Sequence, residues 1–329
     1  MKISVIIAAC HGSAFIGEQL KSILLQTRLP DELLIGDDSW KDNETFQVVE
    51  KFRKEEKIPF KLKYFHNTPP RGVNGNFRFL AEQSSGEIIF FCDQDDWWLP
   101  EKIEKMSAIF EKDPECGAVC CFSTQADRNL SPLAKQNFSE IAIARKYGLE
   151  KKQLFPYFNK VRLAAAGHDM ALRQSMFHLL PSWEDPLLYD DWCIQCCAAA
   201  ERLALVPERL TLRRIHDQNL TVCPEYTPGN QLLTRFSSII SEEDRQREFL
   251  WLLGQKECFC KRLTDSPFIN MVPEHHRKIL KEFPEYLKRR IAYRERKLTG
   301  RIRLNLRLLK EYFIYGNGIR SLIRDFVGL

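Results

Sequence analysis

The sequence lacks any hydrophobic run long enough to cross a bilayer. Its 329 residues contain no stretch of about 18 consecutive apolar residues, which is the length that a spanning helix needs. The apolar stretch at residues 3–9 has only the length of a strand and is too short for an ordinary signal peptide. We therefore expect neither a membrane-spanning helix nor a secretion signal, and we expect a cytoplasmic protein.

The sequence also lacks cysteine pairs with the spacing of a zinc site. The 11 cysteines are an odd number, and the pair Cys193 and Cys196 has no second pair to accompany it. A chain of this length does not need disulfides to stabilise its core. We expect free thiols in a reducing compartment, and core packing rather than metal binding for Cys193 and Cys196.

Basic residues are in the minority along most of the chain and are concentrated at its end. Residues 1–276 contain 34 Lys or Arg against 39 Asp or Glu, whereas residues 277–329 contain 15 against five. Leucine and aromatic residues alternate with basic ones between Arg301 and Tyr315, which favours contact with an anionic membrane surface. The alternative is a solvated helical face. No nucleic-acid motif accompanies the charge, so we expect no nucleic-acid partner.

Strand-like and helix-like patterns alternate along the first third of the chain. β-Branched and apolar runs predict strands at 2–9, 32–35, 60–65 and 87–92, and helical periodicity predicts helices at 15–27, 42–54, 73–83 and 100–112. This alternation predicts an α/β fold with a mostly parallel sheet flanked by helices. From about residue 236 the pattern predicts helices only, with breaks near Pro267, Pro273, Pro284 and residues 316–318. We place the domain boundary near residue 230, with an α/β domain at 1–230 and a basic helical extension at 231–329.

Acidic residues follow two of the predicted strands. Asp93, Asp95 and Asp96 come directly after a buried strand, and Asp37 and Asp38 follow an earlier one. Ligands of parallel α/β sheets bind beyond the carboxyl ends of the strands. Clustered carboxylates resist full ionisation unless a cation joins them, and Mg²⁺ or Mn²⁺ prefers oxygen ligands. Instead of binding a metal, the three later aspartates could stabilise the N-terminus of the helix that starts near residue 100. Asp37 and Asp38 could form a turn and an N-cap.

Several of these stretches together resemble a known family. They are SVIIAA (4–9), SILLQT (22–27), GDD (36–38), GVNGNF (72–77) and FCDQDDWWLP (91–100). Residues 1 to about 225 resemble family 2 glycosyltransferases of the GT-A fold, and particularly the bacterial rhamnosyltransferase-like group that builds O-antigens and capsules. The resemblance implies a Rossmann-like, mostly parallel mixed sheet flanked by helices, followed here by the helical extension.

The resemblance implies a nucleotide-sugar donor and a divalent metal, Mg²⁺ or Mn²⁺. Asp96 would be the direct metal ligand, assisted by Asp95 and by His216, which could instead be structural. Arg71 or Arg214 would neutralise the donor diphosphate, unless either is a solvated surface charge. The expected donor-binding residues, among which Asp38 would contact the nucleobase or ribose, are Ala8, Asp38, Arg71, Asp95 and Arg214.

The resemblance also implies an acceptor side and a catalytic base. Asp191 would be the base that deprotonates the acceptor hydroxyl, although the pair Asp190 and Asp191 could merely cap a helix. The expected acceptor-side residues are Gly167, His168, Asp169, Asp190 and Trp192.

Two loops depart from the family pattern. Where the family usually reads Ala-Thr-Tyr-Asn-Gly, this chain has residues 8–12 as AACHG, which removes a hydroxyl, an aromatic ring and an amide. After Asp38 the usual Gly-Ser is replaced by Ser39 and Trp40. We expect these changes to alter recognition of the nucleobase.

The expected activity is inverting, metal-dependent transfer of rhamnose or another hexose from a nucleoside diphosphate. The acceptor would be a hydroxyl of a growing surface polysaccharide or lipid-linked glycan, at the inner face of the bacterial membrane. One alternative is a non-catalytic GT-A-fold assembly partner at the membrane. A sugar-1-phosphate nucleotidylyltransferase is a weaker alternative, because residues 8–13 lack the glycine-rich, arginine-containing loop that such enzymes use.

Overall fold

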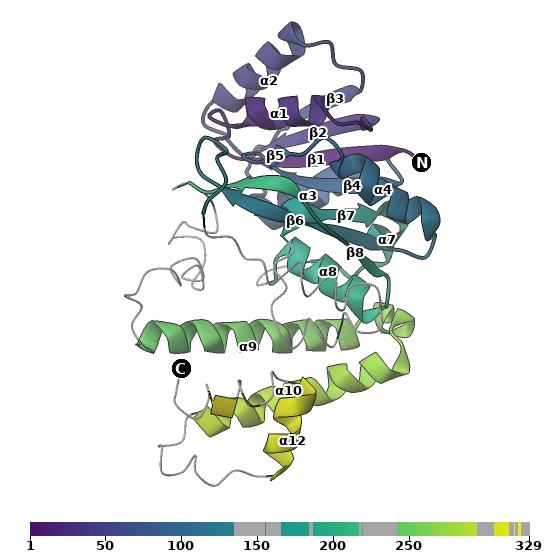
Figure 1. Ribbon diagram of the computed structural model, residues 1–329, viewed down its shortest axis with the longest axis vertical. Helices are drawn as coiled ribbons and strands as arrows, with labels where there is room; N and C mark the ends of the chain where they lie inside the picture. The colour runs from purple at the N-terminus through teal and green to yellow at the C-terminus, as the bar shows by residue number, and fades with distance from the viewer. Residues whose placement is uncertain are drawn as a thin grey trace. The chain divides into compact units, whose positions relative to one another are not determined.

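A computed structural model describes most of the chain, which divides into two compact units (Figure 1). We call Met1–Lys151 with Ala164–Ile215 the α/β unit, and Lys152–Leu163 with His216–Leu329 the helical unit. The predicted boundary near residue 230 lies outside the described residues, which are 1–134, 155, 166–183, 187–216, 219, 242–294, 306–315, 319 and 322–323.

The α/β unit is built on one mixed sheet of eight strands. Strands β3, β2, β1 and β4 run parallel to one another, β7 is antiparallel to both β4 and β6, and β8 runs parallel to β6 and antiparallel to β5. The prediction of a mostly parallel mixed sheet is therefore confirmed. The strands in spatial order are β3 (Lys61–His66), β2 (Glu32–Asp37), β1 (Ile3–Ala9), β4 (Ile88–Asp93), β7 (Met170–Arg173), β6 (Ala118–Ala126), β8 (Leu203–Arg214) and β5 (Trp97–Trp98).

Helices cover both faces of this sheet. The predicted helices of the first third are present as α1 (Ile16–Leu24), α2 (Glu44–Glu55), α3 (Gly72–Gln83) and α4 (Lys102–Lys112). Successive strand residues point to opposite faces, as Phe90 and Phe91 of β4 show. Phe90 joins the core beneath α1, α2 and α4, whereas Phe91 stacks with Tyr189 and contacts the tilted ring of Phe77 of α3 on the other side.

Strands β1, β2 and β4 at the sheet centre are buried along nearly their whole length, which explains their mostly apolar sequence. One close approach fixes α3 against β2: the side chain of Asn76 donates from Nδ2 to the carbonyl of Gly36 at 2.8 Å. A Cβ at residue 36 would collide with the Asn76 amide oxygen, so only glycine fits there. The short strand β5 was not predicted, and α4 begins two residues after Pro100.

The remaining elements of the α/β unit follow β6. They are the 3₁₀ turn η1 (Gly167–Asp169), the short helix α7 (Gln174–Leu179) and helix α8 (Tyr189–Ala199). Because η1 immediately precedes β7, and β7 is antiparallel to β4, η1 lies at the carboxyl end of β4. A segment about 75 residues distant thereby reaches the acidic loop that follows β4.

The helical unit contains the helices that the sequence predicts after residue 236. They are α9 (Glu242–Thr264), the 3₁₀ turn η4 (Pro267–Met271), α10 (Glu274–Arg294) and α12 (Leu306–Tyr315). The predicted breaks at Pro267 and Pro273 are confirmed. The predicted break at Pro284 is wrong, because Pro284 lies inside α10. Arg289 of α10 forms a two-pronged ion pair with Glu311 of α12, at 2.8 and 2.9 Å.

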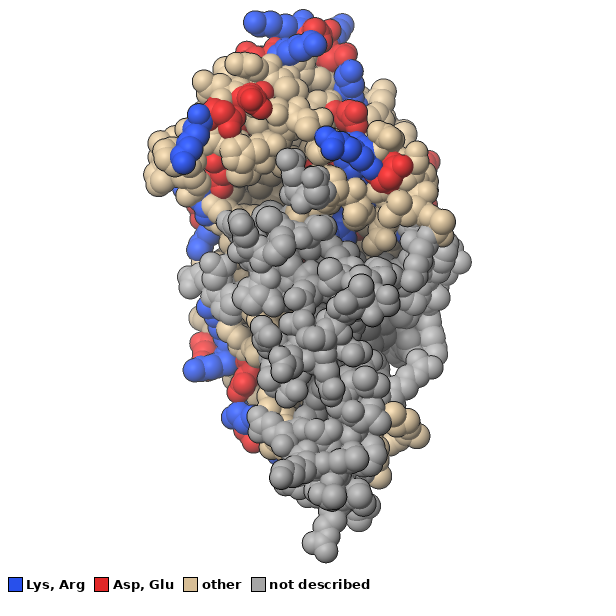
Figure 2. All heavy atoms as spheres, turned by 90° about the vertical axis from the view of Figure 1, so that its left-hand side faces the viewer, with Lys and Arg blue, Asp and Glu red and all other residues tan. Residues whose placement is uncertain are grey.

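Surface charge and hydropathy add two observations. On the face drawn in Figure 2, basic and acidic side chains of the α/β unit are interspersed rather than segregated. No helix in the described parts of the chain is both long and apolar enough to span a bilayer. Most of the basic residues after Arg294, including Arg301 and Arg303, lie outside the described residues.

Candidate active site and metal centre

The acidic loops predicted from the sequence meet at one edge of the sheet. Strand β1 is paired on one side with β2 and on the other with β4. The register places Ala9 opposite Asp37, and Ala8 opposite Asp93. The carboxyl ends of three parallel strands therefore bring both groups of aspartates to the same edge, where ligands of such sheets bind.

The two aspartates after β2 have different surroundings. Asp37 is completely buried, and its carboxylate accepts hydrogen bonds from the Ser39 amide at 2.9 Å, the Ser39 hydroxyl at 2.6 Å and the Tyr64 hydroxyl. Asp38 accepts from Asn67 Nδ2 at 2.8 Å and from the backbone of Arg71 at 3.1 Å. The hydrogen bonds of Asp37 therefore stabilise the turn at Ser39. Those of Asp38 connect the predicted donor site to Arg71, directly before α3.

The Arg71 side chain lies beside the hydrogen bonds of Asp38. Its Nε donates to the side chain of Asn67 at 3.0 Å, and its guanidinium lies over the Phe79 ring at 4.0 Å. Its role in neutralising a diphosphate stays a prediction.

The unusual first loop is tied to the acidic loop. The side-chain amide of Gln94 accepts from the Cys10 amide and donates to the Cys10 carbonyl, both at 2.9 Å. The next residue, His11, donates its backbone N–H to Ser39 at 2.6 Å. Backbone groups therefore hold this loop in place, although the Thr, Tyr and Asn side chains of the family pattern are missing.

The acidic loop itself is held by Arg214, the last residue of β8. Its backbone amide donates to Asp96 Oδ1 at 3.0 Å and its Nε donates to the Asp95 carbonyl at 2.7 Å. The guanidinium also bonds to Glu18 and to the Arg128 carbonyl. Arg214 is buried with protein partners and so positions the acidic loop; direct donor contact stays a prediction.

One oxygen of this loop is left without a hydrogen bond. Asp96 is only 1% exposed, and its Oδ2 is buried with no hydrogen-bond partner. Leaving a buried carboxylate oxygen unsatisfied costs free energy unless a ligand joins it. Asp93 is the accessible member of the loop, because its side chain is 42% exposed.

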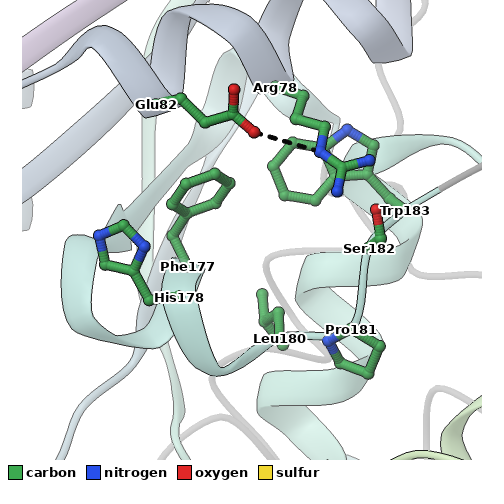
Figure 3. Close-up of a pocket in the computed structure, with 8 residues that line it drawn as sticks. All are labelled: Arg78, Glu82, Phe177, His178, Leu180, Pro181, Ser182 and Trp183. Carbon is green, nitrogen blue, oxygen red and sulfur yellow. Dashed lines mark ion pairs between the residues drawn. The ribbon is translucent and has the colours of Figure 1, made fainter.

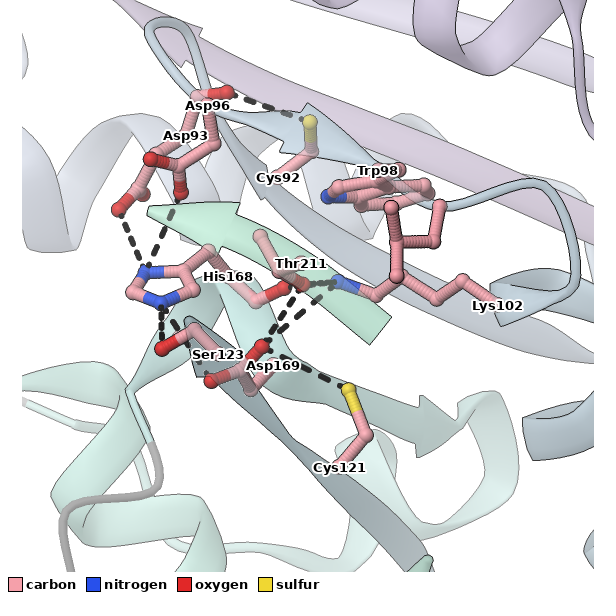
Figure 4. Close-up of polar contacts among 12 residues, drawn as sticks. Cys92, Asp93, Asp96, Trp98, Lys102, Cys121, Ser123, His168, Asp169 and Thr211 are labelled. Carbon is pink, nitrogen blue, oxygen red and sulfur yellow. Dashed lines mark hydrogen bonds and ion pairs between the residues drawn. The ribbon is translucent and has the colours of Figure 1, made fainter. Parts of the chain in front are cut away.

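A histidine faces these two carboxylates. His168 Nδ1 lies 3.1 Å from Asp93 Oδ2 and 3.6 Å from Asp96 Oδ2 (Figure 4). His168 Nε2 lies 3.4 Å from Asp169 Oδ2 and 3.5 Å from the Ser123 hydroxyl. The candidate ligand atoms of Asp93, Asp96 and His168 all lie within 4.8 Å of one another. The predicted metal set of Asp95, Asp96 and His216 shares only Asp96 with this group.

A buried lysine supports the cluster from behind. Lys102 is completely buried, and its Nζ donates to the Thr211 hydroxyl at 2.7 Å and to the His168 carbonyl at 2.5 Å. Thr211 donates in turn to Asp169 Oδ1 at 2.8 Å, and Lys102 Nζ lies 3.9 Å from the same oxygen. The Lys102 ammonium also lies 4.1 Å from the Trp98 ring centroid, so its charge is fully surrounded by protein.

This arrangement shifts the proton affinities of the cluster. Burial and the carboxylates of Asp95 and Asp93 raise the pKa of Asp96, and they prevail over His168, which acts to lower it. Burial alone would lower the pKa of His168, but Asp169 and Asp96 outweigh burial and raise it well above its ordinary value. Burial would likewise raise the pKa of Asp169, yet His168 and Lys102 hold it well below its ordinary value. The carboxylates of this cluster therefore disfavour one another's ionisation, and a bound cation would relieve that repulsion.

The predicted acceptor-side residues adjoin the cluster. Asp190 Oδ2 accepts from the Gly167 amide at 2.9 Å, and Asp190 Oδ1 accepts from the Asp191 amide at 2.8 Å. Because Gly167 directly precedes His168, the start of α8 is connected to the group of Asp93, Asp96 and His168. A Cβ at residue 167 would collide with the Tyr189 hydroxyl, so glycine is needed at this contact.

Two predicted site residues have local partners of their own. Trp192 is 1% exposed, and its indole N–H donates to the Pro181 carbonyl at 2.7 Å, so it packs the start of α8. His216 belongs to the helical unit, where its backbone amide donates to Asn219 Oδ1 at 2.7 Å. Their roles toward acceptor and metal stay predictions.

Sequence reasoning did not identify Lys102 or Thr211, and it assigned His168 to the acceptor side. The available signal for His168 was the sequence Gly-His-Asp directly before a strand. The place of that strand beside β4 could not be read from the chain.

A separate hollow of about 200 Å³ lies between α3 and the segment that follows α7 (Figure 3). Arg78 and Glu82 of α3 form an ion pair of 3.4 Å beside Phe177 and Trp183. Since α7 follows Arg173, which pairs with the first residue of β4, this hollow is at the opposite end of β4 from the acidic loop.

The comparison with known families decides the classification. The family model of glycosyl transferase family 2 matches residues 4–179, which is more than half of the chain and includes every strand from β1 to β7. The chain belongs to glycosyl transferase family 2.

Curated relatives of this family 2 chain match over shorter stretches. An Escherichia coli protein, named UDP-Glc:α-D-GlcNAc-diphosphoundecaprenol β-1,3-glucosyltransferase, is 30% identical over 110 residues, which are 33% of this chain and 41% of that protein. A Campylobacter jejuni GalNAc(5)-diNAcBac-PP-undecaprenol β-1,3-glucosyltransferase is 33% identical over 29% of this chain and 30% of that protein. The match with a Nostoc glycosyltransferase that is named uncharacterized covers 36% of each chain, at 29% identity. The matched stretch is therefore well under half the length of each relative.

Solved structures confirm the GT-A fold of this family 2 member. Residues 1–349 of Staphylococcus aureus TarS, in complex with UDP-GlcNAc, superpose with a TM-score of 0.54 at 16% identity, over 99% of this chain and 82% of that one. A mannosyltransferase from Pyrobaculum calidifontis, in complex with GDP-Man and Mn²⁺, has a TM-score of 0.51 at 14% identity, over 99% of this chain and 86% of that one. At these identities the likeness concerns the fold alone.

Proposed function

We propose that this family 2 member is an inverting, metal-dependent glycosyltransferase. It moves a hexose, rhamnose or another, from a nucleoside diphosphate to a hydroxyl of a surface polysaccharide or lipid-linked glycan. The single observation that carries the proposal is the buried, unsatisfied Asp96 Oδ2 at the edge of the sheet where a nucleotide ligand binds. The alternative of a non-catalytic assembly partner gives this oxygen no purpose.

The residues present suit a divalent cation. Asp96 Oδ2 has no hydrogen bond, Asp93 supplies a second carboxylate, and Asp95 continues the same loop. Carboxylate oxygens are the ligands that Mg²⁺ and Mn²⁺ prefer. When bound there, such a cation supplies positive charge that stabilises the departing diphosphate.

The chain's own groups perform the remaining tasks. Asp38, anchored by Asn67 and the Arg71 amide, accepts hydrogen bonds from the nucleoside. Asp191, in the first turn of α8, takes the proton of the acceptor hydroxyl as that oxygen bonds to the anomeric carbon. The bond from the anomeric carbon to the diphosphate oxygen breaks on the opposite face, so the configuration inverts. The Asp190–Gly167 hydrogen bond, which ties the residue before Asp191 to the segment that carries His168, supports this role.

The acceptor and its location extend this proposal. The names of the Escherichia coli and Campylobacter relatives specify acceptors linked to undecaprenol diphosphate. In the helical unit, α12 exposes Phe313 by 54% and Ile314 by 45% beside Lys310. Apolar side chains next to basic ones suit an anionic lipid surface. We propose a lipid-linked acceptor and a peripheral position on the cytoplasmic face of a bacterial membrane.

The experiment is a donor-hydrolysis and transfer screen across nucleotide sugars, with and without EDTA. Wild-type protein is expected to consume one class of donor and to lose this activity in EDTA. Asp191→Asn is expected to bind that donor normally in calorimetry but to lose transfer, whereas the exposed Glu55→Gln of α2 serves as a matched control and keeps both. Full transfer by Asp191→Asn would remove it from the base role. No donor turnover and no heat with nucleoside diphosphates plus Mn²⁺ would instead support the assembly role.

A further inference from the structure

We propose that the metal centre has a nitrogen ligand, His168, and that Asp169 orients this imidazole as a positioning residue. The protein would then hold the cation through Asp93, Asp96 and His168, and it would favour Mn²⁺ or Co²⁺ over Mg²⁺. This inference rests on the metal dependence in the proposed function, and it adds the identity of the third ligand and the resulting metal preference.

The first argument is the geometry of the three ligand atoms. His168 Nδ1 lies 3.1 Å from Asp93 Oδ2 and 3.6 Å from Asp96 Oδ2, and all three atoms are within 4.8 Å of one another. Neighbouring ligands of an octahedral Mg²⁺ or Mn²⁺ are about 3 Å apart, because each lies about 2.1 Å from the ion at right angles. The Asp93–His168 spacing matches this value, and the 3.6 Å between His168 and Asp96 is longer, so the Asp96 side chain would move slightly toward a bound ion.

The second argument is the unsatisfied oxygen. Asp96 Oδ2 is buried without a hydrogen bond, and His168 Nδ1 lies 3.6 Å from it. An ion bound by both groups would satisfy this oxygen, which neither the protein backbone nor a neighbouring hydroxyl does among the described residues.

The third argument lies behind the imidazole. A metal-bound histidine usually donates its other ring N–H to a carboxylate, which fixes the ring and strengthens the ligand. His168 Nε2 lies 3.4 Å from Asp169 Oδ2, a buried oxygen that has no hydrogen bond, and the other oxygen of that carboxylate accepts from Thr211 Oγ1 and Cys121 Sγ. Binding of an ion would displace the proton that Nδ1 carries toward Asp93, and the proton that remains on Nε2 would face Asp169. The ring is 2% exposed, so it cannot turn toward solvent.

Access and metal preference follow from the same residues. Asp93 is the exposed member, so an ion and its remaining waters reach the cluster past this side chain. Imidazole nitrogen suits the transition metals, whereas Mg²⁺ favours an all-oxygen set. The histidine therefore predicts tighter binding of Mn²⁺ and Co²⁺ than of Mg²⁺ in the absence of any donor.

The test measures metal binding by the full chain without nucleotide. Free Mn²⁺ is followed by electron paramagnetic resonance, with Mg²⁺ as a competitor, for wild type, His168→Gln and Asp169→Asn. We expect the Kd for Mn²⁺ to rise about 10- to 100-fold in His168→Gln and about 10-fold in Asp169→Asn, and the preference for Mn²⁺ over Mg²⁺ to shrink in His168→Gln. The exposed His178→Gln of α7 is the matched control and should bind Mn²⁺ as wild type does. A His168→Gln protein with wild-type Kd for Mn²⁺ overturns the proposal.

A second measurement does not depend on any variant folding. Electron spin-echo modulation of Mn²⁺ bound to the wild-type protein should show coupling to a directly coordinated nitrogen, and the absence of that coupling overturns the proposal. The outcomes also distinguish failure of the histidine ligand from failure of the proposed function. Sugar transfer without nitrogen coordination refutes this inference alone, whereas nitrogen-coordinated Mn²⁺ without transfer to any acceptor refutes the proposed function alone.

Discussion

Two buried carboxylates at different ends of the sheet have opposite surroundings. Glu32, at the start of β2, is 1% exposed, and its oxygens accept from the Ser4 hydroxyl, from the amide and hydroxyl of Ser85, and from Lys63 Nζ, at 2.6 to 3.0 Å. Asp96, beyond the end of β4, is equally buried but has one oxygen without a hydrogen bond. We call these the closed and the open carboxylate.

Their proton affinities differ accordingly. Burial acts to raise the pKa of Glu32, but the hydrogen bonds from Ser4, Ser85 and Lys63 prevail and lower it to about 2. Burial raises the pKa of Asp96, because its partners do not compensate. A closed carboxylate stabilises the fold, whereas an open one is available to a ligand and contributes little to the fold. Each of the following substitutions tests this contrast.

The largest effect on stability is expected at Lys102, the buried lysine behind His168 and Asp169. Lys102→Met removes the buried ammonium beside Asp169 and its hydrogen bonds to Thr211 and the His168 carbonyl, which should lower the free energy of unfolding by about 3–5 kcal/mol. Urea denaturation measures it. Lys105→Met on the same helix is the control, because Lys105 pairs with Glu101 and Glu208 at the surface and should change stability little. Equal losses in the two variants would contradict the buried role of Lys102.

The open carboxylate itself should matter for activity rather than stability. Asp96→Asn keeps the Oδ1 acceptor for the Arg214 amide and removes a buried charge, so the melting temperature should hold or rise. Transfer should fall about 100- to 1000-fold, since the leaving diphosphate loses electrostatic stabilisation. Initial rates and calorimetric melting measure the two effects. A variant that melts earlier yet transfers normally would show Asp96 to be a second closed group.

The closed carboxylate should show the reverse pattern. Glu32→Gln should lower the free energy of unfolding by about 1–3 kcal/mol near pH 7 and leave transfer unchanged well below the melting temperature. The folded-state pKa of Glu32, about 2, is below its ordinary value of 4.5. Its stabilising contribution is therefore complete above pH 4.5 and is lost as the pH falls toward 2. Denaturation curves of both proteins across this window should converge at the acid end; a constant gap would contradict the assignment.

The smallest effect is expected at the edge of the closed network. Lys63 contacts Glu32 at 3.0 Å, but its side chain is 41% exposed, so solvent screens the ion pair. Lys63→Met should lower the free energy of unfolding by about 1 kcal/mol or less. Chemical denaturation at low and high salt measures this, and a loss as large as that of Glu32→Gln would show that the lysine closes the network.

The sequence predicts the parallel half of the fold well, because each element there has a local signal. The apolar run before Ala9 became β1, and the periodicity around Phe77 became α3, because core burial follows such patterns directly. The acidic edge was predicted for the same reason, since parallel strands end at one edge. The two-residue strand β5 has no such signal, because it forms only through pairing with β8.

The surroundings of the acids could not be predicted in the same way. His168 reaches Asp93 across a sequence distance of 75 residues, and Arg214 reaches Asp96 across 118. Both contacts arise from the antiparallel insertion of β7 beside β4 and from the length of β8, which are properties of the assembled sheet. Lys102 gives no sign in the sequence of being buried, since lysine usually is not.

The antiparallel placement of β7 has a consequence for the order of folding. Contacts across long sequence separations require loop closures whose entropy must be overcome before they stabilise anything, so they tend to form late. The first 134 residues contain Asp93 and Asp96, while the imidazole, Asp169 and Arg214 come from later segments. A nascent chain stopped at that length contains the two carboxylates but lacks the histidine. Metal binding with the full set of ligands would therefore indicate that the α/β unit has folded.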